Sequence, residues 1–336
     1  MCELRTTLIA SQYLMKPIDY ITSPEVSVIV TVFEREQYLH NAIESILAQT
    51  FLNYEILVTD DSNKTSISQI CESFHCDNRL RYRSNARQLG VPLNVRASIQ
   101  AAKGKYIAIL NDDDYWEATF LEKLVPALEE NPDRVIAFSD HWVVRENGVV
   151  DKAATDANTL LCGRKTLECG EIEKPPSFVL KKNGLPLAMS SLFRKDALDL
   201  SLLTKEVVGA YDFWISCILA ASRKPFYYVP ERLTYYRVHG QSETARKSPD
   251  KSQPMIYIFE QLLERNWFPT LRPFLKHRLA EAFYSNGRDL LWFGQLAAAR
   301  KMFLKAIQMS WHLKSVAMFV LSFAPGFIRR RLHLSE

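Results

Sequence analysis

Two clusters of acidic residues stand where their type and spacing could do chemistry. Asn111-Asp112-Asp113-Asp114 follows one apolar run, and Asp60-Asp61 follows an earlier one. Successive carboxylates repel one another, whereas Mg²⁺ or Mn²⁺ prefers carboxylate oxygens together with water and phosphate oxygens. The triplet therefore indicates a divalent-metal site, although a turn in which Asp114 caps the next helix explains it equally well. Taken alone, Asp60-Asp61 is better explained as the start of a turn.

Two further residues could join such chemistry. Asp212 opens an apolar helix, where an acid is commonly an N-terminal cap. A carboxylate beside aromatic rings can also have its pKa raised toward use as a general base. His239 follows Arg237 in a presumed loop and could reach a diphosphate or its metal. The cap and an ordinary surface histidine are the better explanations of Asp212 and His239 taken alone.

Alternating strands and helices must position these groups. Apolar, β-branched runs predict strands at 26–32, 54–59, 80–83, 105–110 and 134–139. Helical periodicity predicts helices at 39–47, 65–74, 92–102 and 117–130. This alternation predicts βαβ units and a mostly parallel sheet, in which ligands bind outside the carboxyl ends of the strands. Both acidic clusters lie at such ends, so together they favour one functional crevice over two separate turns.

The rest of the chain is less regular at first and then helical. Residues 141–205 are interpreted as loops and short elements that carry an acceptor region, and 207–221 as a helix. A polar linker runs to about residue 253, and 254–320 is interpreted as helical throughout. Residues 287–308 carry a weak tetratricopeptide-like pattern, but one such unit is not an array.

Composition excludes several classes of protein. The chain has 336 residues, of which 47% are hydrophobic and 24% charged, as expected of one large globular domain or two. A net charge of +4 is too small to argue for nucleic acid, and we expect none as a partner. The six cysteines form no paired framework, which favours reduced thiols and a cytoplasmic location.

The sequence lacks Walker A, G-x-G-x-x-G, H-E-x-x-H and G-x-S-x-G motifs, and its cysteine spacing does not fit a zinc site.

Membrane segments are not predicted either. The first 23 residues lack the apolar core of a signal peptide. The longest apolar run, 316–328, is shorter than the about 20 residues that a spanning helix needs. The tail is basic, however, with Lys301, Lys305, Lys314 and Arg329-Arg330-Arg331 against Glu336. Peripheral contact with the inner face of an anionic membrane therefore stays open, and a packed helix with a solvated basic end is slightly favoured.

A succession of short motifs carries a family resemblance. The motifs, in order along the chain, are 24–31, 42–50, 55–62, then Asn85, Gly90 and Asn94, then 102–107 and 110–114. This succession closely resembles the start of family 2 glycosyltransferases, over roughly 24–240 and more weakly beyond 150. The resemblance implies a glycosyltransferase A fold, an α/β architecture with a mostly parallel sheet flanked by helices. It divides the chain into an N-terminal extension (1–23), a catalytic domain (24–245) and a helical C-terminal region (246–336).

The resemblance also implies a donor site. Thr31 and Asp61 match the nucleoside contacts, and Asn94 belongs to the same donor-binding motifs. Asp113 matches the metal-contacting acid of the D-x-D motif, and Asp112 its neighbour toward the sugar or ribose. The implied donor is a nucleoside-diphosphate sugar, by default a UDP-sugar, and the implied cofactor is Mn²⁺ or Mg²⁺.

Asp212 matches the family's catalytic base, and His239 matches a motif near the end of the catalytic domain and is assigned to the metal. Two positions depart from the family pattern. Asn111 replaces the first acid of D-x-D, which could weaken metal dependence, and Tyr211 stands where the family often has Glu.

These expectations combine into an inverting transferase that moves a sugar to a hydroxyl of a saccharide or lipid-linked acceptor. Polysaccharide or glycoconjugate synthesis is the expected setting. Two alternatives stay open. One is a non-catalytic nucleotide-, sugar- or partner-binding module on the same fold. The other is a nucleotidyltransferase, which should carry a Gly-rich basic loop that 33–36 does not provide.

Overall fold

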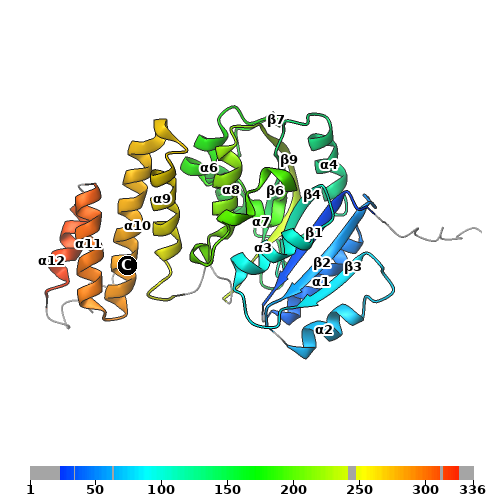
Figure 1. The fold of residues 1–336 in the computed structure, drawn as a ribbon, viewed down its shortest axis with the longest axis horizontal. Helices are drawn as coiled ribbons and strands as arrows, with labels where there is room; N and C mark the ends of the chain where they lie inside the picture. The colour runs from blue at the N-terminus through cyan, green and yellow to red at the C-terminus, as the bar shows by residue number, and fades with distance from the viewer. Residues whose placement is uncertain (1–22, 34, 63, 241–246, 311–312, 325–336) are drawn as a thin grey trace, which may run out of the picture.

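The structure is a computed structural model, and it describes residues 23–33, 35–62, 64–240, 247–310 and 313–324. It consists of an α/β body and an array of helices beside it (Figure 1). Residues 1–22 of the predicted N-terminal extension and the basic residues Arg329-Arg330-Arg331 lie outside the described residues. In the described part of the chain, no helix combines the length and the apolar character that a bilayer span requires.

One mixed sheet forms the centre of the body. Its first part is parallel, in the order β3 (Leu80–Ser84), β2 (Tyr54–Asp60), β1 (Val26–Val32) and β4 (Tyr106–Asn111). The sheet continues through β8 (Ser191–Arg194), which is antiparallel to β4 and to β6 (Ile136–Arg145). Beyond β6 come the parallel strand β9 (Phe226–Val238) and, antiparallel to it, the short strands β5 (Tyr115–Trp116) and β7 (Gly170–Glu171).

Helices cover both faces of the sheet, which explains why the strands are apolar along their whole length. Val28 and Val30 belong to a core shared with α1 (Glu36–Leu47), α2 (Thr65–Glu72) and α4 (Phe120–Glu129). Ile29 points to the other face, whose core is shared with α3 (Val91–Ala101), α6 (Pro175–Lys182), α7 (Leu187–Ser190) and α8 (Tyr211–Ala221). Because β2 and β4 both run parallel to β1 between them, the carboxyl ends of β2 and β4 lie at one edge of this sheet.

The C-terminal helices are attached to the body through aromatic contacts. They are α9 (Gln253–Arg265), α10 (Arg272–Trp292), α11 (Leu296–Met309) and α12 (Leu313–Leu321), side by side in Figure 1. Trp267 after α9 stacks on Trp214 of α8 with ring centroids 5.5 Å apart, and Phe259 meets Phe213 edge to face. The prediction of helices over 254–320 is confirmed, with breaks at Asn266 (φ 49°) and Gly294 (φ 78°).

Several predicted elements differ from the structure. The interpretation of 141–205 as loops and short elements is wrong in part, because β6 continues to Arg145 and α5 spans Lys152–Leu161. The helix predicted from 117 begins at Phe120, because Tyr115–Trp116 pairs with β9. The helix predicted from 207 begins at Tyr211, after the 3₁₀ turn Lys205–Val207.

Strand β9 is not expected from the sequence. Pro230 and two charged residues interrupt its middle, and a proline inside an apolar run argues against a strand. The structure accommodates the interruption with register shifts between β6 and β9 around Asp140, which is the geometry of a bulge. The second half of β9 carries the chain back to the carboxyl end of β4.

Candidate functional site

The acidic turn, residues 111–114, ends β4 at the sheet edge. Asp112 is completely buried, and its Oδ2 accepts the backbone N–H of Phe33 at 3.1 Å. Arg35 Nη2 lies 2.8 Å from Asp112 Oδ1, yet among the described residues no group is aligned to donate a hydrogen bond to that oxygen. Burial raises the pKa of Asp112 to about 7; the charge of Arg35 opposes this shift, and the charge of Asp113 adds to it.

Asp113 meets two groups that come from distant parts of the chain. Its Oδ2 lies 3.0 Å from His239 Nε2 and also accepts a hydrogen bond from Arg35 Nη1. The Tyr38 ring packs against His239 with centroids 5.1 Å apart. Arg237, two residues before His239, donates from Nε to the backbone carbonyl of Asp113 at 3.0 Å. The predicted pairing of Asp113 with His239 in one site is thus geometrically possible, and their role toward a metal stays a prediction.

Asp114 fastens the turn to β9 and does not cap the following helix. Its Oδ1 accepts the backbone N–H of Arg237 at 2.9 Å, and its Oδ2 accepts from Nδ2 of Asn111 at 3.3 Å. The helix that follows has Thr119 as its N-cap, so the capping interpretation of the triplet is wrong. Burial, and then the charge of Asp113, raises the pKa of Asp114.

Asp61 organises the second acidic cluster. Its carboxylate accepts the backbone N–H groups of Leu89 at 2.8 Å and Gly90 at 2.7 Å, and the side-chain amide of Asn85 at 2.9 Å. Gly90 has φ 78°, a left-handed backbone that suits glycine and lets its N–H face the carboxylate. Asp61 therefore holds the entrance to α3 against the end of β2.

Thr31 and Asn94, the other two residues assigned to the donor, lie on different elements, β1 and α3. Thr31 is 8% exposed at the end of β1, in register with Asn111 of β4. Asn94 on α3 is 1% exposed; its Nδ2 donates to the carbonyl of Thr59 at 3.1 Å, and its Oδ1 accepts from Asn85 at 2.9 Å. Asn94 thus lies behind Asp61 and supports it through Asn85.

Asp212 lies in the first turn of α8, whose N-cap is Ala210. Its Oδ1 accepts the N–H of Phe213 at 2.7 Å, as expected of an acid near a helix N-terminus. Burial raises the pKa of the Asp212 carboxyl, although the backbone N–H groups of Phe213 and of Asp212 itself lower it. The neighbouring Tyr211 donates from Oη to Oδ1 of Asn111 at 3.2 Å, which joins the start of α8 to the acidic turn.

Arg35 is the residue at the acidic turn that sequence reasoning misses. In the sequence it belongs to a short loop, 33–36, that fails to resemble a phosphate-binding one. The usable signal is its place at the N-cap of α1, where a cation opposes the helix dipole. A cation in that place needs another partner, and Asp112 and Asp113 supply it.

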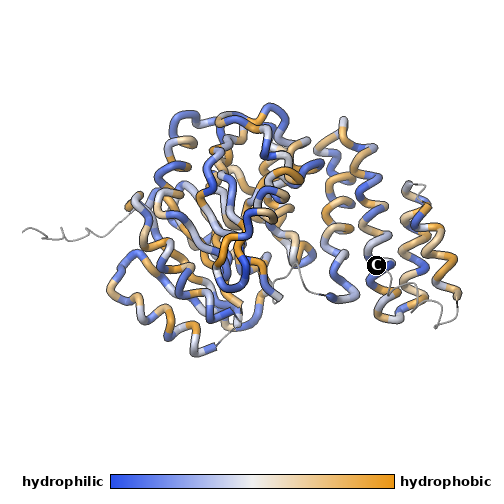
Figure 2. Tube along the Cα trace, turned by 180° about the vertical axis from the view of Figure 1, so that it is seen from behind, coloured by the Kyte–Doolittle hydropathy of each residue, from blue (hydrophilic) through white to orange (hydrophobic). Residues whose placement is uncertain are grey.

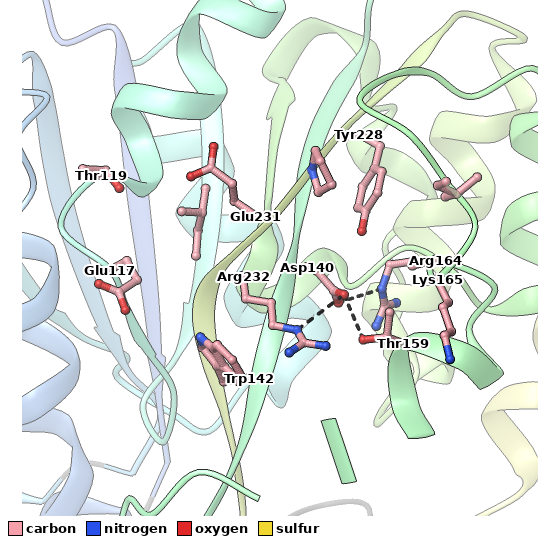
Figure 3. A pocket seen from close by; sticks show the side chains of 13 residues that line it. Glu117, Thr119, Asp140, Trp142, Thr159, Arg164, Lys165, Tyr228, Glu231 and Arg232 are labelled. Atoms are coloured by element: carbon pink, nitrogen blue, oxygen red, sulfur yellow. Dashed lines mark hydrogen bonds and ion pairs between the residues drawn. The ribbon is translucent and has the colours of Figure 1, made fainter. Parts of the chain in front are cut away.

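A separate hollow of about 680 Å³ lies along β9 (Figure 3). At its centre Asp140 accepts from Arg164 Nε at 3.0 Å and from Thr159 Oγ1 at 2.8 Å, with Arg232 Nε 4.0 Å away. Within the described chain, none of the predicted site residues lines it. Its charges compensate one another, so we place the candidate site at the acidic turn.

Comparisons with known proteins agree on one family. The model of glycosyl transferase family 2 matches residues 27–156. An uncharacterized glycosyltransferase of Methanocaldococcus jannaschii is 31% identical over 64% of this chain and 71% of its own length. Another, from Haemophilus influenzae, is 29% identical over 67% of this chain and 72% of its own.

Solved structures show the same fold. TarS 1–349 of S. aureus, in complex with UDP-GlcNAc, has a TM-score of 0.64 at 16% identity, with 89% of each chain covered. The mannosyltransferase PcManGT of Pyrobaculum calidifontis, in complex with GDP-Man and Mn²⁺, has a TM-score of 0.54 at 17% identity, covering 92% of this chain and 83% of that one. The expected α/β glycosyltransferase A architecture is confirmed by these likenesses, although the sheet is mixed where a mostly parallel one is expected.

Proposed function

Because this chain belongs to glycosyltransferase family 2 and is a sugar-transferring enzyme, we propose that it moves a sugar from a nucleoside-diphosphate sugar to a hydroxyl, with inversion at the anomeric carbon. A UDP-sugar is the proposed donor, and a saccharide or a lipid-linked sugar is the proposed acceptor, in polysaccharide or glycoconjugate synthesis. We assign catalysis to residues 24–245. The observation that carries the proposal is the meeting of Asp113, His239 and Arg35 beside the start of α8.

The acidic turn fits a divalent cation in part. Within the described residues, no group of three or more His, Cys, Asp or Glu side chains is gathered to hold a metal. Mg²⁺ and Mn²⁺ are commonly held by one or two carboxylates, with phosphate oxygens and water completing the shell. Asp113 and His239 could supply the protein part of that shell, and the donor's diphosphate the rest. A bound Mn²⁺ or Mg²⁺ would offset the charge that gathers on the leaving diphosphate.

The remaining donor contacts follow from position. Thr31 and Asp61 lie at the ends of neighbouring strands and suit the nucleoside, and we assign Asp112 to the ribose or sugar. Asn94 is buried and engaged, so we assign it support of Asp61 in place of direct contact. Arg35 carries a side chain that is 23% exposed and positively charged, which suits a diphosphate oxygen.

Asp212 is the proposed general base. The acceptor hydroxyl oxygen forms a bond to the anomeric carbon, its proton passes to the Asp212 carboxylate, and the electron pair of the breaking C–O bond leaves with the diphosphate. Burial favours this role because it raises the pKa of Asp212 and so strengthens it as a base. A single displacement of this kind inverts the anomeric configuration.

Calorimetric titration of UDP tests the donor half of the site. With Mn²⁺ present we expect binding that a chelator abolishes and that Asp113→Ala weakens roughly tenfold or more. Asp133→Ala is the matched control, because the Asp133 side chain is 76% exposed and lies in a loop outside the site. Equal binding by Asp113→Ala and the wild type would contradict the proposed metal centre.

A further inference from the structure

Tyr211 connects the helix of the proposed base with the acidic turn. It is the first residue of α8, 7% exposed, and it precedes Asp212 directly. Its Oη donates to Asn111 Oδ1 at 3.2 Å across 100 residues of sequence. Burial and the nearby charges of Asp212 and Asp114 raise the pKa of the phenol, so Tyr211 keeps its proton and acts as a donor.

Asn111 is engaged on both sides of its amide. Oδ1 accepts from Tyr211, and Nδ2 donates to Asp114 Oδ2 at 3.3 Å. An amide accepts from one neighbour and donates to the other, whereas an ionised carboxylate at this position has no hydrogen to give. Aspartate at 111 would also place another carboxyl group beside Asp114, which is 1% exposed.

The contact continues beyond the turn. Asp114 Oδ1 accepts the backbone N–H of Arg237, and His239 follows two residues later beside Asp113. One series of hydrogen bonds therefore runs from α8 through the acidic turn to the end of β9. At its other side α8 is anchored by Trp214, whose Nε1 donates to the carbonyl of Leu202 at 2.8 Å.

We propose that Asn111 and Tyr211 form a clasp that sets the position of Asp212 against the donor site, and that Asn111 is not a metal ligand. Both are positioning residues, and the two departures of this chain from the family's motifs are the two partners of one hydrogen bond. The inference rests on the proposed function, because it assigns Asp212 the role of base. It explains why an amide replaces the acid: the residue orients α8 and leaves the cation to Asp113 and His239.

The first test is Tyr211→Phe, with Tyr54→Phe as its matched control. Tyr54 is completely buried and its Oη donates to the carbonyl of Ile46 at 2.7 Å, but it lies at the opposite end of β2 from the site. The readout is Mn²⁺-dependent release of UDP from UDP-GlcNAc, in which water replaces the unidentified acceptor. We expect Tyr211→Phe to lower kcat by the order of ten- to a hundredfold with little change in KM, since small misplacements are costly in this range. Tyr54→Phe should keep the wild-type kcat.

The second test separates the clasp from a metal ligand. Mn²⁺ binding in the presence of UDP, followed by electron paramagnetic resonance, should be no tighter in Asn111→Asp than in the wild type, and kcat should fall. A gain of roughly tenfold or more in Mn²⁺ affinity would make residue 111 a ligand position and overturn the proposal. The double variant Tyr211→Phe/Asn111→Ala should lose no more than the worse single variant, because both remove the same contact.

A third readout does not depend on turnover. Hydrogen exchange of the first-turn amides of α8 should accelerate in Tyr211→Phe and stay unchanged in Tyr54→Phe. Equal exchange and equal kcat in the two variants would overturn the clasp. If the wild type neither binds UDP with Mn²⁺ nor releases UDP, the proposed function fails; exchange at α8 still decides whether the clasp exists.

Discussion

Asp112, Asp113 and Asp114 are consecutive, yet each carboxylate meets a different set of partners. Asp112 accepts a backbone N–H from the loop after β1, and Asp114 accepts the backbone N–H of Arg237. Asp113 instead faces another potential cation ligand, His239. Asp112 and Asp114 therefore fasten the turn to the backbone of other segments, whereas Asp113 pairs with a side chain, that of His239.

The pH dependence of transfer tests the assignment of Asp212. A general base must be ionised, so kcat should be lost as the pH falls through the pKa of Asp212 and recovered as it rises. Because burial raises that pKa, the acid limb should lie above the range of an ordinary aspartate, about 3.9. UDP release from UDP-GlcNAc with Mn²⁺, measured across pH, gives the profile.

Asp212→Asn should lower kcat by roughly 10²–10⁴-fold and remove the acid limb, while UDP still binds. Asp156→Asn is the control, since the Asp156 side chain is 69% exposed and pairs at the surface with Arg232. Wild-type turnover in Asp212→Asn would exclude Asp212 as the base.

At the scale of elements, the helix pair α10–α11 includes one very close approach. Gly287 of α10 faces Phe303 of α11, and a Cβ built on Gly287 would lie 2.5 Å from Phe303 Cε1. Phe303 is completely buried, so its ring has little room to retreat. The weak tetratricopeptide-like pattern at 287–308 thus corresponds to one tightly packed antiparallel pair.

Gly287→Ala should destabilise the helical region by about 1–3 kcal/mol through overpacking. Thermal unfolding of the purified chain measures the loss, and UDP binding should be unchanged because the site lies in the α/β body. Adding Phe303→Leu should recover part of the stability by making room for the new methyl group. Additive losses in the double variant would show that the ring is not what the methyl group meets.

At the scale of the whole molecule, the C-terminal helices contact the body through α9 and the residues after it, and the last helix, α12, is more exposed. Figure 2 shows a hydrophobic stretch on α12, at the far end from the sheet. Leu313, Val320 and Phe323 are 75%, 64% and 60% exposed. Arg300 of α11 donates to the carbonyl of Ser322 at 2.8 Å, so α12 is packed and still presents apolar side chains.

We propose that this end of the molecule contacts an anionic membrane surface, because the exposed Lys301 and Lys314 belong to the same C-terminal helices as the exposed apolar residues. In flotation assays the protein should bind vesicles that contain phosphatidylglycerol, bind neutral phosphatidylcholine vesicles less, and dissociate at high salt. Phe323→Ser should weaken binding more than Leu52→Ser, since Leu52 is 67% exposed in the α/β body. Recovery of all the protein below the vesicles would contradict membrane contact.

The sequence alone determined the parallel half of the sheet and the place of the acidic residues. The strands β1, β2 and β4 and the helices between them are encoded in local periodicity, which depends only on neighbouring residues. Parallel strands place their carboxyl ends at one edge, so the sequence by itself predicts Asp61 and Asp113 in one crevice. The glycosyltransferase A fold implied by the motifs is confirmed by the likeness to TarS, while the antiparallel pairings of the second half of the sheet are not expected.

Which side chains meet depends on how distant segments of the chain pack together. Asp113 and His239 are 126 residues apart, and Asn111 and Tyr211 are 100 apart. The strand that returns His239 to the site, β9, is hidden in the sequence because Pro230 breaks its pattern and its pairing with β6 shifts register. No local spacing encodes such contacts, because they arise when separate elements pack on one sheet. The periodicity of a segment depends on its own residues, whereas the partner of a side chain depends on how all the elements pack together.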